Sequence, residues 1–358
     1  MILSTKPDFE RVKTAWRHFY AGEVYKRPLV LAVCRAGKEK PVDLREHMYY
    51  HAVTGNYQAQ LDLIDRYLEQ VVYLGESVPM FNVNHGPDQF AAFLGAKLRF
   101  AEGSHRTNWV DPIIEDWDDF LPIRFDESNP TYQSVLRYAR LMARHGEGRY
   151  LVSQLDYHTH ADALSALRGP QRFAMDFIDY PDKVEQAMAQ IRKLYPLVYN
   201  AVYEAGNMGG EKGCGHIIWC EGKCAVVQCD FIIMLGPRHF RKFVLPAIEE
   251  EVGFLDHSIF HLDGVGAFRH LNDLLTIKGL DVIQLVPGAG QKPAHEYVDL
   301  LKKCLAAGKG VQVYGAGLNF ERIKFLHKEL GPRGVIYCPA IGNADEVRRI
   351  MDWLERNT

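Results

Sequence analysis

Short runs of β-branched, aliphatic and aromatic residues recur along the chain, and most are followed by a stretch with apolar residues at helical spacing. Apolar runs of this length, bounded by Gly, Pro or polar clusters, are typical of buried strands. The pattern predicts eight strands, at residues 27–33, 71–75, 149–157, 216–220, 258–264, 280–288, 310–317 and 334–342.

Helices are predicted where apolar residues recur every three or four positions. The last predicted helix opens on Asn343 with Glu346 three residues later, an N-cap pairing. Residues 84–148 show no sustained period, and we interpret them as a long irregular excursion that covers a site. The predicted helices span residues 57–70, 182–206, 238–255, 266–277, 294–307, 319–330 and 344–356.

The alternation of strands and helices predicts an α/β fold built from right-handed βαβ units around a parallel sheet. Eight strands fit a closed (β/α)8 TIM barrel, in a single domain over residues 1–358 with an N-terminal extension and an insertion after strand two. An open doubly wound sheet is the competing architecture. It is disfavoured because the stretches "VPGAG" and "YGAG" lack the G-x-G-x-x-G spacing of a dinucleotide-binding turn.

Composition narrows the function classes. Hydrophobic residues make up 47% of the chain and charged residues 24%, which is ordinary for a globular protein, and the net charge of −3 favours neither nucleic acid nor anionic membranes. The apolar runs are too short to span a bilayer and the N-terminus resembles no secretory signal, so we expect a cytoplasmic protein. The seven scattered cysteines argue against a disulfide framework, and the four between residues 214 and 229 match no zinc or iron–sulfur spacing.

Side chains of acid, base and metal-binding types gather at the C-terminal ends of the predicted strands, where TIM barrels carry their active sites. His261 and Asp263 end the fifth strand, and because side chains alternate along a strand, both point to the same side. They form either a metal-binding or catalytic pair, or a buried ion pair that stiffens the strand end. The other strand ends supply Asp156, Tyr157, His158, His160, Asp230, Gln284, Tyr314 and Cys338.

Each of these positions also has a purely structural interpretation. Asp230 contacts a substrate or caps the turn after its strand. Cys338 binds a metal or fills the core as a small apolar residue. The histidines of "DYHTHAD" belong to a site, or they are exposed beside a helix that Thr159 or Asp162 caps.

Two more substrate-binding candidates lie away from the strand ends. Arg168 clamps a substrate anion or forms a structural salt bridge. His85 lies on the predicted excursion, where it is a lid residue or a solvated loop residue.

Four stretches carry a resemblance to the uroporphyrinogen decarboxylase superfamily, which includes the decarboxylase itself and corrinoid-dependent methyltransferases. The resemblance covers nearly the whole chain at the level of pattern, and it implies a TIM barrel. The stretches are "HSIFHLDGVGAFRHLNDLLTIKGLDVIQ", "QCDFIIMLGPRHFRKFVLPAIEEE", "ADALSALRG" and "NHGPDQFAAFLG".

The decarboxylase branch fits poorly. It has an arginine-rich motif after its first strand, whereas this chain has "CRAGKEK", in which Arg35 and Lys38 are the candidate cations. It also has an aspartate near the end of its second strand, and the neutral Asn82 and Asn84 stand in that stretch here. The charge that would stabilise a pyrrole cation is therefore missing.

The methyltransferase branch fits better. His261 matches the histidine of the zinc site in its thiol-activating members, Asp263 stands where their first cysteine would be, and Cys338 lies near their distant cysteine. The resemblance therefore implies zinc, or a similar metal, at these three residues. An Asp ligand is harder than a thiolate and leaves the ion more Lewis acidic, which suits the oxygen of a methyl ether better than a thiol.

The resemblance implies transfer of a methyl group from a small methylated substrate, such as an O-methyl compound, to the corrinoid of a separate protein. Two alternatives stay open: a corrinoid-independent lyase or decarboxylase acting on a small acid, and a barrel that binds a ligand without turnover. Monomer and homodimer are both compatible with the sequence. The catalytic candidates are Asp230, Asp156 and His160, and the substrate-binding candidates are Gln284, Tyr314, Arg168, His85, Tyr157 and His158.

Overall fold

The centre of the fold is a seven-stranded sheet. A computed structural model describes residues 2–45, 48–100 and 107–358. The strand order is β2-β1-β13-β12-β11-β10-β9, and every neighbouring pair is parallel except β1 with β2. The strands are β2 (Val71–Gly75), β1 (Leu29–Arg35), β13 (Val335–Cys338), β12 (Gly310–Tyr314), β11 (Val282–Val286), β10 (His257–Asp263) and β9 (Cys224–Gln228).

Three two-stranded sheets accompany it. β3 (Met80–Asn82) pairs in parallel with β6 (Leu151–Ser153). The pairs β4 (Leu98–Phe100) with β5 (Asn108–Val110), and β7 (Gly213–Gly215) with β8 (Ile218–Cys220), are antiparallel. The pairing over the described residues confirms an α/β fold with a mostly parallel central sheet, whereas closure into a ring of eight strands stays a prediction.

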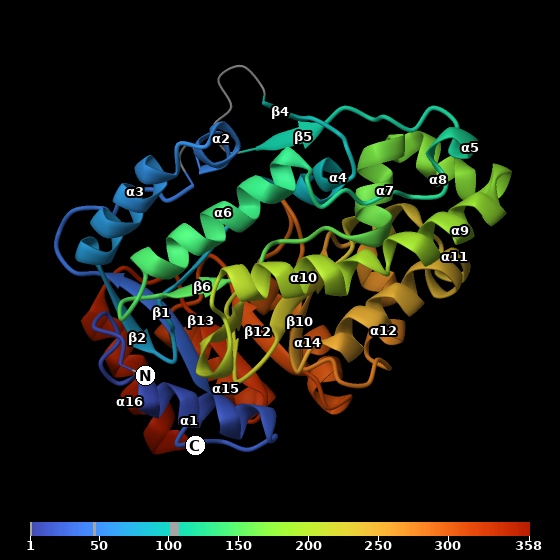
Figure 1. Cartoon of the computed structure of the whole chain (residues 1–358). Coiled ribbons are helices and arrows are strands. Elements are labelled where there is room, and N and C mark those ends of the chain that lie inside the picture. The colour runs from blue at the N-terminus through green and yellow to red at the C-terminus, as the bar shows by residue number, and fades with distance from the viewer. Residues whose placement is uncertain (1, 46–47, 101–106) are drawn as a thin grey trace.

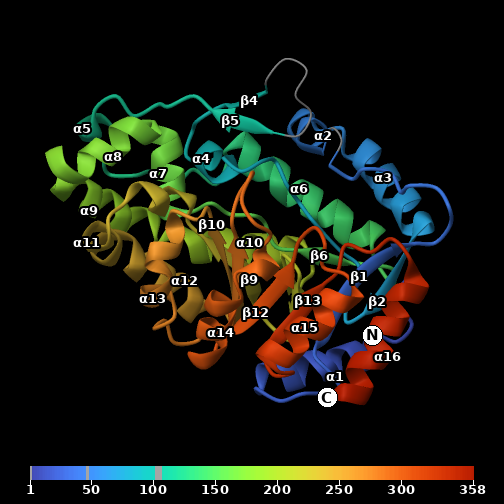
Figure 2. The same cartoon turned by 180° about the vertical axis from the view of Figure 1, so that it is seen from behind.

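Helices surround the strands on several sides (Figures 1 and 2). α1 and α16 lie at the same end of the molecule, together with both chain termini, in both views. None of the described helices combines the length and the hydrophobicity that crossing a membrane requires. The longer helices are α1 (Phe9–Tyr20), α3 (Tyr57–Gln70), α6 (Pro130–His145), α8 (Pro170–Asp179), α9 (Pro181–Ile191), α10 (Leu194–Ala205), α12 (Leu245–Phe254), α15 (Phe320–Leu330) and α16 (Ala344–Asn357).

The shorter helices and helical turns lie between these longer elements along the chain. They are α2 (Met48–Thr54), α4 (Gln89–Phe93), α5 (Trp117–Phe120), α7 (His160–Arg168), α11 (Pro237–His239), α13 (Leu271–Leu274), α14 (Val298–Ala306) and the 3₁₀ turns η1 (Gly210–Lys212), η2 (Asp230–Met234), η4 (Ala267–His270) and η5 (Ala294–Glu296). A π-helical turn, η3 (Phe240–Val244), joins α11 to α12.

Two predicted strands form, but neither takes the place in a parallel sheet that was expected of it. The run at 71–75 forms β2, but it lies antiparallel to β1 instead of extending a parallel sheet. The run at 216–220 gives only β8, which pairs with β7 in a hairpin, and the parallel strand is β9, a few residues later. The sequence of a five-residue apolar run does not specify whether the strand pairs parallel or antiparallel. In both cases the neighbouring strand determines the orientation.

The expectation for residues 84–148 was also wrong in part. This segment contains α6, a helix of 16 residues whose apolar face is buried. Asn129 caps α6, because its side-chain oxygen accepts hydrogen bonds from the backbone N–H groups of Thr131 and Tyr132 at 2.9 and 3.0 Å. The predicted cap at the start of α16 is confirmed, since Asn343 accepts from the N–H groups of Asp345 and Glu346.

The predicted helices 182–206 and 238–255 are each interrupted. The first divides into α9 and α10. The second contains the π-helical turn just before α12, which has Pro246 in its first turn. Proline has no N–H to donate, so the start of a helix accommodates it at little cost.

A buried carboxylate connects β2 to the start of β1. Glu76 is 2% exposed and binds the Arg27 guanidinium through both oxygens, at 2.8 and 3.0 Å. It also accepts hydrogen bonds from Arg11 at 2.6 Å and from the backbone N–H of Val30 at 2.9 Å. Burial alone would raise the pKa of Glu76, but these cations and hydrogen bonds lower it below its usual 4.5.

We expect Glu76→Gln to lower the free energy of unfolding at pH 7 by about 3 kcal/mol, because two arginines would lose a buried counter-charge. A depressed carboxyl pKa contributes stability above the unfolded-state value, and that stability is lost as the pH falls through the folded-state value. Urea denaturation should therefore show a constant deficit from pH 7 to 5 and a shrinking one below the usual 4.5. Glu69→Gln, on the exposed side of α3, is the matched control, and an equal loss in both variants would contradict this role.

Candidate functional site

A row of polar side chains crosses four neighbouring strands in register. His261 on β10 is paired with Gln228 on β9 and with Gln284 on β11. Gln284 is in turn paired with Gln312 on β12. All three glutamines are buried, so the sheet carries a line of amide and imidazole groups through an otherwise apolar interior.

This row fixes the orientation of His261. Its Nδ1 forms a hydrogen bond with the side-chain oxygen of Gln284, and the Gln284 amide nitrogen donates to Nε2 of His216 at 3.0 Å. The amide oxygen can only accept, so Nδ1 of His261 carries the proton and Nε2 is left to bind another group.

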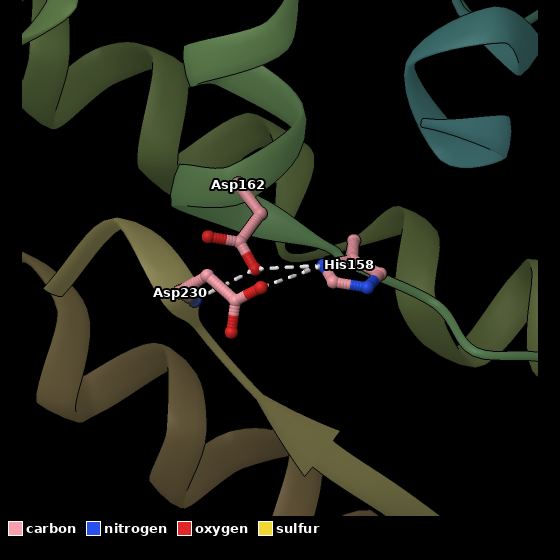
Figure 3. Close-up of side chains that lie close together, drawn as sticks. All are labelled: His158, Asp162 and Asp230. Atoms are coloured by element: carbon pink, nitrogen blue, oxygen red, sulfur yellow. Dashed lines mark hydrogen bonds and ion pairs between the residues drawn. The ribbon is translucent and has the colours of Figure 1, made fainter. Parts of the chain in front are cut away.

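A second cluster forms around His158, just beyond β6 (Figure 3). Its Nδ1 lies 3.3 Å from a carboxylate oxygen of Asp162 and 3.8 Å from one of Asp230. On the other side of the ring, Nε2 lies 3.5 Å from Asp156. Gln228, from the row described above, donates to the other oxygen of Asp156. The two groups of polar residues are therefore connected.

Asp162 fixes the turn that follows β9. Its two oxygens accept hydrogen bonds from the backbone N–H groups of Asp230 and Phe231, at 3.0 and 2.9 Å. These are the first residues of η2. Asp162, in the first turn of α7, thus caps a different helical turn and places Asp230 beside His158.

Contacts within the cluster keep His158 and Asp156 charged despite their burial. Burial disfavours the His158 cation, but hydrogen bonds with Asp156 and Asp162 outweigh it and raise the pKa of His158 well above its usual 6.5. Burial disfavours the Asp156 anion in the same way, and the contact with His158 lowers the pKa of Asp156 to about 2. Burial, and next the charge of Asp162, raise the pKa of Asp230 to about 7, so Asp230 exchanges a proton near neutral pH.

Asp230 also belongs to a second group that has metal-binding chemistry. One donor atom from each of Asp230, His261 and Asp263 lies within 4.8 Å of the others, and the same holds for His158, Asp162 and Asp230. Asp230 is common to both groups. Cys338 belongs to neither of these two groups of described residues.

A cavity of about 760 Å³ opens beside this site. His261, Asp156, His216 and Cys338 line it, and the amide nitrogen of Gln312 lies 3.5 Å from the Cys338 sulfur. Burial raises the pKa of Cys338 to about 12, which keeps this thiol protonated. Tyr314 is the last residue of β12, and burial raises the pKa of its hydroxyl to about 12.

Two candidates have structural surroundings away from the cavity. Arg168 forms a buried ion pair with Asp176, at 2.8 and 3.2 Å, and donates to the backbone oxygens of Ile114 and Glu115. Of the two roles that the sequence allowed for Arg168, these contacts match the structural salt bridge. His85 is 1% exposed and bonds to the Ser134 hydroxyl at 2.9 Å, so it is a core residue of the insertion and not a solvated one.

Tyr157 and His160 are buried behind the site. The Tyr157 hydroxyl donates to the Gln154 side chain. Nδ1 of His160 accepts from the backbone of Ala161, and its Nε2 lies 3.9 Å from Glu251. Burial lowers the pKa of His160 to about 4 and raises that of Glu251 to about 8, so both groups are neutral at pH 7.

Three participants were not among the sequence candidates for the site: Asp162, His216 and Gln228. Asp162 was interpreted only as a helix cap. His216 and His158 have positive φ angles of 54° and 42°, in a region that residues other than glycine rarely adopt. The sequence signal for His216 was its position between Gly215 and a strand, which is weak without the fold.

No protein-family model matches this sequence, and the search of curated proteins gives no significant match. Among solved structures, the chain is similar to a methyltransferase from Methanosarcina mazei, with a TM-score of 0.60 and 14% sequence identity. The alignment covers 97% of this chain and 98% of that one. At this identity the similarity shows a common fold over the whole chain.

The carboxylates around His158 raise its pKa, so its ring should stay protonated above pH 6.5, the usual pKa of a histidine. In Asp162→Asn the imidazolium loses one of its anionic partners, so we expect the pKa of His158 to fall. NMR titration of ¹⁵N-histidine-labelled protein would measure both values, with His158→Gln to assign the signal. Titration of the unchanged protein at or below pH 6.5 would contradict the charge assignment.

Proposed function

We propose that this chain is a methyltransferase that moves a methyl group from a small methylated substrate to the corrinoid of a separate protein. The observation that carries the proposal is the convergence of Asp230 and Asp263 on His261, which lines a cavity of about 760 Å³. The whole-chain fold similarity to a methyltransferase supports it. So does the resemblance of the sequence around His261 to the corrinoid-dependent branch of the uroporphyrinogen decarboxylase superfamily.

The donor set fits a divalent metal. One imidazole and two carboxylates are ligands that zinc accepts, and three protein ligands leave a position for substrate. Nε2 of His261 is unengaged by the contacts described, and Oδ1 of Asp230 is buried without a hydrogen-bond partner. Gln284 orients His261 from behind, as outer partners of metal-binding histidines do.

A metal held there would act as a Lewis acid on the heteroatom that carries the methyl group. The chain's own residues bind the substrate in the cavity and orient its methyl group. For an ether, the C–O bond would break and the methyl group would pass, without the electrons of that bond, to the reduced corrinoid of the acceptor protein, which would supply the electron pair. The oxygen leaves with the C–O electron pair and takes up one proton. Protonated His158, which contacts the cavity-lining carboxylate of Asp156, would be the source of that proton.

We also propose that the strands close into the barrel that the sequence predicts. The cavity is lined both by the seven-stranded sheet and by the separate pair β3–β6. Met80 and Ser153 face it from the pair, and Val33, Val226 and His261 from the large sheet. Strands of both sheets around one cavity are what a TIM barrel would provide.

A corrinoid-independent lyase or decarboxylase acting on a small acid is the second candidate. Asp230 favours it, because a carboxyl group with a pKa of about 7 can donate and accept a proton at neutral pH. Such an enzyme would release its product without any methyl acceptor.

The purified protein should bind about one zinc ion per chain, and His261→Ala and Asp263→Ala should each lower its zinc affinity by more than about tenfold. Metal quantification after dialysis against chelators of graded affinity would measure this. Cys338→Ala distinguishes two ligand sets: unchanged zinc affinity supports Asp230 as the third ligand, whereas a loss equal to that of His261→Ala supports Cys338.

Methyl transfer is tested with the zinc-loaded protein, free cob(I)alamin and a panel of methyl ethers, by the absorbance change on methylation of the cobalt. We expect methylation that His261→Ala abolishes. Zinc binding without methylation of either free or protein-bound corrinoid would contradict the methyltransferase. Product release without an acceptor would then indicate the lyase.

Gln284→Leu should lower zinc affinity about tenfold to a hundredfold, because His261 loses the partner that fixes its ring. Gln312→Leu, on the neighbouring strand and bonded to Cys338, is the matched control. Equal affinities in Gln284→Leu and the unchanged protein would show that Gln284 has no orienting role.

A further inference from the structure

The loop between β6 and α7 has a strained backbone conformation on both sides of Thr159. His158 and His160 have φ angles of 42° and 36°, in the left-handed region that residues other than glycine rarely adopt. Such a conformation costs free energy and persists only where surrounding contacts hold it in place. The ring of His160 supplies one contact, since its Nδ1 accepts a hydrogen bond from the backbone N–H of Ala161 at 2.8 Å. The conformation of His158 needs contacts of its own.

Thr159 forms a hydrogen bond that its position in the helix does not favour. It is the N-cap residue of α7, and a threonine there usually accepts a hydrogen bond from a backbone N–H two or three residues later. Within the described part of the chain, its side chain forms no such cap. Its hydroxyl donates instead to Oε1 of Glu251, on α12, which is 92 residues away in the sequence. The start of α7 thus lacks a local cap and has a long-range connection in its place.

A second bond holds the other end of this loop. The side-chain nitrogen of Gln89, a fully buried residue of α4, donates to the backbone oxygen of Asp156 at 2.8 Å. Thr159 and Glu251 are 3% and 6% exposed, so water competes little for the bond between them. His158 therefore lies between two buried anchor points, one on α4 and one on α12.

Resting on the proposed methyl transfer, we propose that Glu251, by its bond to Thr159, positions His158 for its part in the reaction. The bond holds the left-handed turn, and this turn directs the His158 ring toward Asp162 and Asp230 (Figure 3). In this place His158 supplies the proton that the leaving oxygen takes up. Glu251 and Thr159 are not among the described residues that line the cavity, so both act through His158 and not on the substrate.

The proposal is tested by NMR of the full-length, ¹⁵N-histidine-labelled protein at pH 7. Thr159→Val removes the hydroxyl but keeps the shape of the side chain, and Glu251→Leu removes the acceptor. We expect both variants to shift the ring signals of His158, because its turn is no longer held. Thr159→Ser and Glu251→Gln keep a donor and an acceptor, so both should restore the signals of the unchanged protein. Unshifted His158 signals in Thr159→Val and Glu251→Leu would overturn the proposal.

Methyl-transfer kinetics with the zinc-loaded protein test the same role. Thr159→Val and Glu251→Leu should lower kcat about tenfold to a hundredfold, because a displacement of about 1 Å in a reacting group has an effect of this size. KM should change little, since neither side chain lines the cavity. A rise in KM with kcat unchanged would overturn the proposal.

Glu250→Gln is the matched control on α12. Glu250 is the exposed neighbour of Glu251 and pairs with Arg192, away from the loop. This variant should change neither kcat nor the His158 signals. Changes as large as those in Glu251→Leu would show that α12 acts in general, and would overturn the specific role of Glu251.

Urea denaturation separates positioning from stability alone. Thr159→Val and Glu251→Leu should lower the free energy of unfolding, because each leaves a buried polar group without its partner. Glu251→Asp keeps the carboxyl but withdraws it by one methylene, and should shift the His158 signals in a protein that still folds. A loss of stability with unshifted His158 signals would show that the bond is only structural, and would overturn the proposal.

These outcomes are separable from failure of the proposed function. The His158 signals require no substrate, metal or corrinoid. Shifted signals in a protein that transfers no methyl group would support the positioning of His158 and contradict the methyl transfer. Methyl transfer that is equally fast in Thr159→Val and in the unchanged protein would overturn the positioning role and leave the methyltransferase.

Discussion

The register between β9, β10, β11 and β12 is the constraint on which the site depends. In-register parallel pairing places Gln228, His261, Gln284 and Gln312 side by side across the sheet. A shift of one residue in β10 would turn His261 and Asp263 to the opposite face and bring Leu262 into the row. The apolar residues between the polar ones, such as Phe260 and Leu262, are fully buried and oppose such a shift. Packing of these apolar side chains in the core thus determines which face of the sheet presents His261 and Asp263.

Much of this arrangement could be predicted from the sequence, because the second half of the chain has regular alternation. β10 and α3 match the predicted segments to within one residue at each end. His261, Asp263 and Asp230 were found from the rule that polar residues ending parallel strands converge, and they meet in one group. The role of Cys338 as a metal ligand stays a prediction.

The first half could not be predicted as well, for physical reasons. β3 has three residues, too few for a period to be visible, whereas β6 lies within the predicted strand 149–157 but keeps only three of its residues. The direction of β2 follows from its pairing with β1, which local sequence does not specify. Asp162 and His216 reach the site through contacts with Asp230 and Gln284, which are far away in the sequence. Only the folded chain brings such partners together.

The half-buried thiol of Cys338 gives this cavity a built-in chemical reporter. The other six cysteines are buried free thiols, whereas Cys338 has partial access and lines the cavity next to Gln312. Its high pKa makes alkylation slow, because the thiolate is the form that reacts. Because the other six thiols are buried, small thiol reagents would label this position selectively, although slowly, and the labelling rate would fall whenever a molecule occupies the cavity. Occupancy could then be followed by mass spectrometry for compounds whose turnover has no assay.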